Sequence, residues 1–120
     1  MKWDGSERRG FVRVNVPCKI IINSPQKHII STNIINISAG GIRILISEKL
    51  TISSIVDLEM RLNSLVSCKG KVLWVINKHH MDKGGDLLFD TGIEFYEIKE
   101  EERHQIKDFV VSITMGTYPP

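Results

Sequence analysis

Apolar and polar residues alternate with a period of two along most of this chain. Alternation of this kind is typical of β-strands with one buried and one exposed face, because successive side chains point to opposite sides of a sheet. Pro17 lies inside the first such run and cannot donate a ladder hydrogen bond, so it predicts an edge or a bulge at that point. The residues expected on the buried face of this run are Val14, Val16, Cys18, Ile20 and Ile22.

Two isoleucine-rich segments follow, over residues 28–37 and 42–46. Both are predicted to be strands, since β-branched residues pack well on a pleated surface. The turn between them reads Asn36-Ile37-Ser38-Ala39-Gly40-Gly41. Gly40 and Gly41 permit a positive φ and a close approach to the backbone. Asn36 and Ser38 have short side chains that bond to nearby amides or to a ligand.

Three more segments alternate, over residues 56–62, 66–76 and 87–95. In the second of these, Trp74 is expected on the buried face together with Val72 and Ile76. Residues 77–85 are polar, end in two glycines and predict a hairpin loop. In the last segment, Leu87, Phe89, Ile93 and Phe95 are expected to face the core.

The period changes near the end of the chain. Ile106, Phe109, Val110 and Ile113 have the spacing of an amphipathic helix. This stripe is expected to pack on the β layer, with a partner-binding helix as the alternative. Short strands without a βαβ rhythm favour an antiparallel barrel or sandwich.

Composition narrows the classes of function. The chain has 120 residues, which is the length of one small domain, and its formal net charge of +2 argues for neither a strong DNA binder nor a membrane coat. Its first ten residues are polar and basic, and no apolar run is long enough to span a bilayer, so a cytoplasmic location is expected. Cys18 and Cys68 fall in apolar alternations and are expected to be core residues.

A cluster of arginines precedes the first strand. Arg9 and Arg13 are spaced as R-x-x-x-R, and Arg8 comes directly before them. Arginine presents a planar fork of donors that binds phosphates and the O6 and N7 edge of guanine. Residues 1–12 are interpreted either as an untethered terminus or as a flexible arm that becomes ordered around a ligand.

The two motifs, R-x-x-x-R and N-x-S-x-x-G, occur in the order found in the PilZ domain family. A late Gly92-Ile93-Glu94-Phe95 also resembles the G-[IV]-x-F strand of that family. The resemblance implies an all-β fold, a six-stranded antiparallel β-barrel of the split-barrel type with a C-terminal α-helix. It would occupy residues 13–114, with residues 115–120 as a tail. The family consists of bacterial receptors for the second messenger cyclic di-GMP.

The resemblance also implies roles for single residues. Arg9 and Arg13 would contact guanine edges and phosphates of cyclic di-GMP. Asn36 would read a guanine edge, Ser38 would bond to a phosphate or a guanine, and Gly41 would keep the turn open for the ligand.

An arginine at the position of Arg8 goes, in the family, with two intercalated ligand molecules instead of one. Asn36 stands where many members have Asp, and an uncharged acceptor there predicts weaker binding. Arg43, close to the glycine turn, is read either as a solvated strand residue or as a further ligand contact. Ligand binding is expected to order the arm and to signal to a separate, unidentified protein.

Other functions stay open. A PilZ-like domain can act as a ligand-independent adaptor, a small barrel with a basic arm can bind single-stranded nucleic acid, and the arm can grip an acidic protein. Few aromatic residues are available for base stacking, which disfavours the nucleic-acid binder. No enzyme, cofactor or metal site is expected, because no nucleophile, base and orienting group come together, and His79-His80 with Asp82 lacks a metal-ligand spacing.

Overall fold

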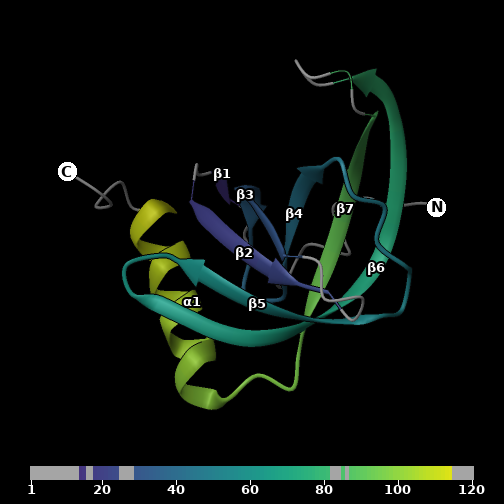
Figure 1. Cartoon of the computed structure of the whole chain (residues 1–120). Coiled ribbons are helices and arrows are strands. Elements are labelled where there is room, and N and C mark those ends of the chain that lie inside the picture. The colour runs from purple at the N-terminus through teal and green to yellow at the C-terminus, as the bar shows by residue number, and fades with distance from the viewer. Residues whose placement is uncertain (1–13, 16–17, 25–28, 82–84, 86, 115–120) are drawn as a thin grey trace, which may run out of the picture.

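The computed structural model describes residues 14–15, 18–24, 29–81, 85 and 87–114, which form a curled β-sheet and one helix (Figure 1). The strands are β1 (Val14–Asn15), β2 (Lys19–Asn23), β3 (Ile29–Ile37), β4 (Gly41–Ile46), β5 (Ile55–Arg61), β6 (Leu65–Met81) and β7 (Leu87–Tyr96). The helix is α1 (Glu100–Thr114). The predicted all-β fold with a C-terminal helix is therefore confirmed.

The sheet closes on itself. Its strand order is β1-β3-β2-β5-β6-β7-β4, every pairing is antiparallel, and β3 also pairs with β4. Both β1 and β2 pair with β3, so they occupy one strand position in two pieces, Val14–Asn15 and Lys19–Asn23. Counted in this way the barrel has six strands, and closure leaves few unpaired strand edges.

Isoleucine fills the interior. On β4, Ile42, Ile44 and Ile46 are all buried, while Arg43 between them faces outward. The alternation predicted for residues 56–62 is also correct, since Val56, Leu58, Met60 and Leu62 are buried and the charged residues of β5 are exposed. Cys18 is buried and Cys68 packs against the core, and both are free thiols.

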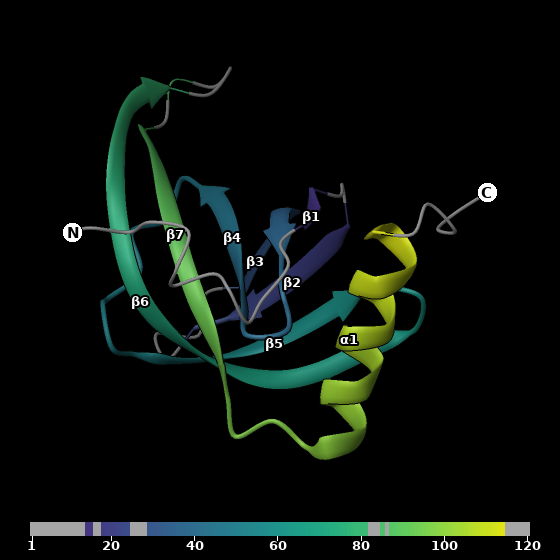
Figure 2. The same cartoon turned by 180° about the vertical axis from the view of Figure 1, so that it is seen from behind.

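The helix completes the core from one side of the barrel (Figure 2). Ile106, Phe109 and Val110 are buried, and Ile113 packs against the same cluster. Three glutamates occupy the first turn, where the helix dipole favours negative charge. The apolar stripe of α1 is thus used inside the domain, as expected.

Strand β6 differs from its prediction in two ways. It continues through Met81, so the expected loop over residues 77–85 is wrong for its first five positions. Its register against β7 also shifts between Val72 and Trp74. The extra residue of this bulge is Leu73, and a bulge reverses the face to which the following side chains point. Ile76 is accordingly exposed, and Val75 packs against the core in its place.

One smaller expectation also fails, because Leu87 is exposed and not in the core. Gly40 and Gly41 permit a positive φ but do not adopt one. Among the described glycines a positive φ occurs at Gly85, with φ of 90°.

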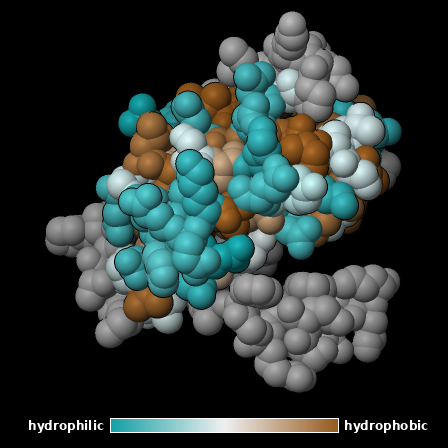
Figure 3. Space-filling view, turned by 90° about the horizontal axis from the view of Figure 1, so that it is seen from below, coloured by the Kyte–Doolittle hydropathy of each residue, from teal (hydrophilic) through white to brown (hydrophobic). Residues whose placement is uncertain are grey.

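The surface seen from below is largely hydrophilic, with hydrophobic patches between the polar side chains (Figure 3).

Candidate ligand-binding site

The turn with the N-x-S-x-x-G motif is closed by its own hydrogen bonds. The Ser38 amide donates to the Gly41 carbonyl at 2.9 Å, and the Gly40 amide donates to Ser38 Oγ at 3.2 Å. Ser38 is 2% exposed, so its hydroxyl oxygen serves the turn in this conformation. A direct bond from Ser38 to a ligand stays a prediction.

Gly41 is required by packing. A Cβ atom at this position would collide with the carbonyl oxygen of Ile93, because β4 and β7 approach each other closely there. The glycine was expected to leave room for a ligand. The structure shows that it also lets the two strands pair at Gly41 and Glu94, and its role beside a ligand stays a prediction.

Four residues form one line across the outer face of the barrel, which we call the cross-strand row. Asn36 on β3 pairs with Arg43 on β4, Arg43 pairs with Gly92 on β7, and Gly92 pairs with Trp74 on β6. Paired residues on adjacent strands point to the same face. The strand spacing makes this row about 14 Å long. Asn36, the predicted site residue, therefore lies beside Arg43.

Trp74 is outside the core, contrary to the prediction. A Cβ added to Gly92 would collide with the Trp74 ring, so the indole covers the bare backbone of Gly92. The bulge before Trp74 turns its side chain to the outer face, and the glycine on β7 leaves the space in which the ring lies. An aromatic ring thus ends the cross-strand row.

Arg43 is held by an acidic residue of β7. Its Nε donates to Asp90 Oδ1 at 2.8 Å, and its Nη2 donates to Asp90 Oδ2 at 2.6 Å. Lys78 Nζ lies 3.8 Å from Asp90 Oδ2. The Asp90 side chain is 6% exposed and that of Arg43 is 39% exposed. The hydrogen bond to Asp90 raises the pKa of Arg43, which keeps the guanidinium charged.

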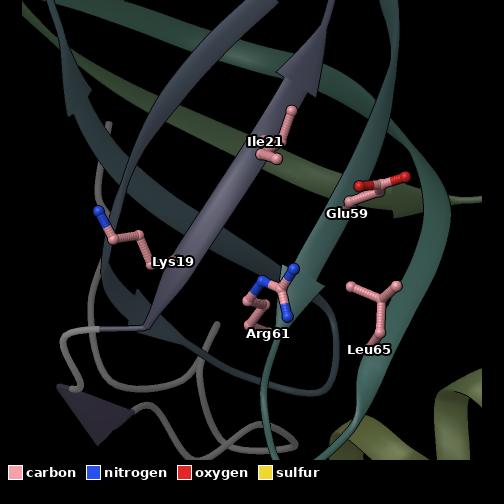
Figure 4. Close-up of a pocket in the computed structure, with 5 residues that line it drawn as sticks. All are labelled: Lys19, Ile21, Glu59, Arg61 and Leu65. Carbon is pink, nitrogen blue, oxygen red and sulfur yellow. The ribbon is translucent and has the colours of Figure 1, made fainter.

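A second feature lies on the outer face of β2, β5 and the start of β6. It is a shallow depression lined by Lys19, Ile21, Glu59, Arg61 and Leu65 (Figure 4). The nearby ion pair of Lys69 and Asp57, with Nζ to Oδ1 at 3.0 Å, is exposed on both sides. The depression contains none of the predicted site residues.

Three predicted site residues, Arg8, Arg9 and Arg13, lie outside the described residues, as does the predicted arm. Asn36, Ser38 and Gly41 lie together at the end of β3 and the start of β4. Among the described residues, no group of three or more His, Cys, Asp or Glu side chains is arranged to hold a metal ion. No helix in that part of the chain is long and apolar enough to cross a membrane.

Comparison with known families gives a clear result. The PilZ domain model matches residues 7–112. The chain belongs to the PilZ domain family. Its match includes both motifs and the late strand with Gly92. A search among curated proteins found no match.

Solved structures of PilZ proteins share this fold. The inhibitor of motility MotI/DgrA of Bacillus subtilis is 21% identical, with a TM-score of 0.72 over 92% of this chain and 52% of its own. The PilZ domain of YcgR from Escherichia coli, solved with c-di-GMP, is 12% identical, with a TM-score of 0.69 over 91% of this chain and 93% of its own. MrkH of K. pneumonia, solved as a c-di-GMP complex, is 12% identical, with a TM-score of 0.72 over 91% of this chain and 53% of its own. The chain thus spans about half the length of MotI/DgrA and MrkH.

Proposed function

We propose that this PilZ domain is a receptor for cyclic di-GMP and acts as a binding module without catalysis. The observation that carries the proposal is the cross-strand row, which brings an amide, a guanidinium and an indole together on one outer face directly beside the motif turn. These three groups match a ligand made of flat guanine rings and phosphates. The PilZ structures solved with c-di-GMP support the choice of ligand.

In the proposed complex, Arg9 and Arg13 close over the ligand from the N-terminal side and contact guanine edges and phosphates. Asn36 reads one guanine edge from the barrel surface. Trp74, which the bulge places outside, offers a stacking surface at the other end of the row. Ordering of residues 1–12 around the ligand then creates a new surface for a downstream protein.

Isothermal titration with cyclic di-GMP tests this function. Wild-type protein should give saturable binding, and an Arg9→Ala, Arg13→Ala variant should lose it. Removing two charge-assisted contacts costs roughly 3–6 kcal/mol, or about 10²- to 10⁴-fold in Kd. The matched control is Lys19→Ala, Arg61→Ala, which removes the same net charge from the depression and should bind normally.

The same titration measures stoichiometry. Two ligands per chain, falling to one in Arg8→Ala, would support the role proposed for Arg8. Folded wild-type protein that gives no heat at high ligand concentration would refute the receptor function. A ligand-independent adaptor would then be the better interpretation.

Ordering of the arm has its own readout. Amide hydrogen exchange of residues 1–12 should slow on addition of cyclic di-GMP in the wild-type protein. Unchanged exchange at saturating ligand would contradict signalling through the arm, even if binding itself is normal.

A further inference from the structure

Two residues outside both motifs, Arg43 and Asp90, are arranged as a unit at the centre of the cross-strand row. They lie 47 positions apart in the sequence and meet because β4 pairs with β7. Asp90 is on the outer face yet almost fully covered, and both of its carboxylate oxygens accept from Arg43. A buried carboxylate is costly unless it is paired in this way, and a buried ion pair is weak evidence for stability. A role for the pair other than stability is therefore worth seeking.

The geometry of the pair determines which N–H donors of Arg43 remain for a ligand. A guanidinium has five N–H donors, and Asp90 takes one from Nε and one from Nη2. The three that are left belong to Nη1 and Nη2, on the edge turned away from Asp90. This edge presents two parallel donors, which fit two neighbouring acceptors such as O6 and N7 of guanine. Adenine has a donor in place of O6 and would oppose one of them.

We infer that Arg43, held in place by Asp90, reads a guanine edge and makes this site prefer guanine to adenine. Asp90 is a positioning residue: it does not touch the ligand, and it fixes the direction of the Arg43 donors. Lys78 Nζ, at 3.8 Å from Asp90 Oδ2, is a second cation beside the same carboxylate. The inference rests on the proposed function and assigns the base specificity of that same site.

The test compares cyclic di-GMP with cyclic di-AMP in titrations of the full chain. Wild type should bind the guanine ligand about 10- to 100-fold more tightly, since a good bidentate contact discriminates by that factor. Arg43→Lys keeps a cation beside Asp90 and removes the two-donor edge, so the ratio should fall by about tenfold or more. Asp90→Asn should lower the ratio in the same direction.

A charge swap separates positioning from simple stability. Arg43→Asp with Asp90→Arg restores an ion pair between β4 and β7 and moves the guanidinium to the wrong strand. This variant should unfold near the wild-type urea midpoint. Its preference for the guanine ligand should be as low as that of Arg43→Lys. Trp74 emission shows whether the ligand still reaches the row. It is recorded in a Trp3→Phe background, because Trp3 is the other of the two tryptophans in the chain.

The outcomes distinguish the two proposals. Wild type that does not bind cyclic di-GMP refutes the proposed function, and with it the inference. Wild type that binds, loses binding in Arg9→Ala, Arg13→Ala, and keeps its guanine preference in Arg43→Lys and Asp90→Asn refutes the inference alone. Recovery of the preference in the charge-swap variant would also overturn it, because only pairing and not the place of Arg43 would then matter.

Discussion

Two ion pairs on the outer face of this barrel differ in almost every respect. Arg43 and Asp90 share two hydrogen bonds, and the Asp90 side chain is 6% exposed. Lys69 and Asp57 share one bond of 3.0 Å, with side chains 49% and 63% exposed. An exposed pair adds little to stability, whereas breaking a buried one leaves an unpaired charge. Cross-strand register alone therefore does not tell which surface positions tolerate change.

The backbones of the two regions differ as well. In the cross-strand row, Gly92 is covered by an indole, and Gly41 nearby allows two strands to meet. The depression on β2, β5 and β6 is lined instead by long side chains that extend from ordinary strand positions. Residue size is thus constrained at Gly41 and Gly92. Substitutions in both regions test how far they differ.

The largest effect on stability is expected for Gly41→Ala. The new Cβ would collide with the backbone carbonyl of Ile93, which cannot move without separating β4 from β7. A loss of about 2–4 kcal/mol in the free energy of unfolding is expected, measured by urea titration. A loss below about 0.5 kcal/mol would contradict the close approach of the two strands.

The next effect is expected for Arg43→Met. This change keeps a side chain over Asp90 but removes both hydrogen bonds, and Lys78 is then the one cation among the described residues that lies within 4 Å of the carboxylate. The expected loss is about 2 kcal/mol, discounted for the partial exposure of Arg43. Asp90→Asn should cost less, because the exposed guanidinium can bind water instead. If the two costs were reversed, Asp90 would be better solvated than its burial indicates.

A smaller effect is expected for Gly92→Ala. The added methyl meets only the Trp74 ring, and a side chain can turn away where a backbone carbonyl cannot. About 1 kcal/mol should be lost. The emission maximum of Trp74, recorded in a Trp3→Phe background, should shift to longer wavelength as the ring moves into water. An unchanged spectrum would mean that the indole does not rest on Gly92.

Much of this fold follows from local alternation. The buried residues of β5 and the inward isoleucines of β4 are predictable. Apolar residues that alternate with polar ones along a strand all point to the same face, and that face is the buried one. The stripe of α1 is equally clear. The turn at Asn36 is recognisable from its composition, and its place beside Arg43 follows once β3 and β4 are paired.

The rest depends on contacts between distant segments. Nothing in the sequence around Trp74 marks the bulge that turns it outward, because the bulge exists only relative to β7. Asp90 lies in an apolar strand and looks like an interruption until Arg43 is placed beside it. Gly41 resembles a turn glycine, although its requirement comes from Ile93 more than 50 positions away. Residue spacing alone contains none of this information.

Cys68 is next to Lys69 on β6, but it packs against the core whereas Lys69 is exposed. It therefore tests whether substitutions on β6 are tolerated only on the outer face. Burial, together with the charge of Glu102, raises the pKa of Cys68 to about 12 from 9.0. The folded state therefore favours the protonated thiol. Its contribution to stability is complete below pH 9 and is lost as the pH rises from 9 to 12.

Two measurements follow for Cys68. Urea midpoints should fall above pH 9 in wild type and fall less in Cys68→Ala, and the thiol should react with iodoacetamide at pH 8 at least about 100-fold more slowly than in unfolded protein. A fast reaction in the folded state, or the same pH dependence in Cys68→Ala, would show that Cys68 is not held in the core.

The smallest effect is expected for Lys69→Met, which is the counterpart of Arg43→Met in the second ion pair of the outer face. The hydrogen bond to Asp57 raises the pKa of Lys69, but water surrounds the ammonium and screens the charge. The urea midpoint should not change within error, in low or high salt, and cyclic di-GMP binding should equal that of wild type. Asp57→Asn should behave in the same way. If Lys69→Met lowered the midpoint as much as Arg43→Met, burial of the carboxylate would not explain the difference between the two ion pairs. The number of ion pairs, and not their burial, would then determine their contribution to stability.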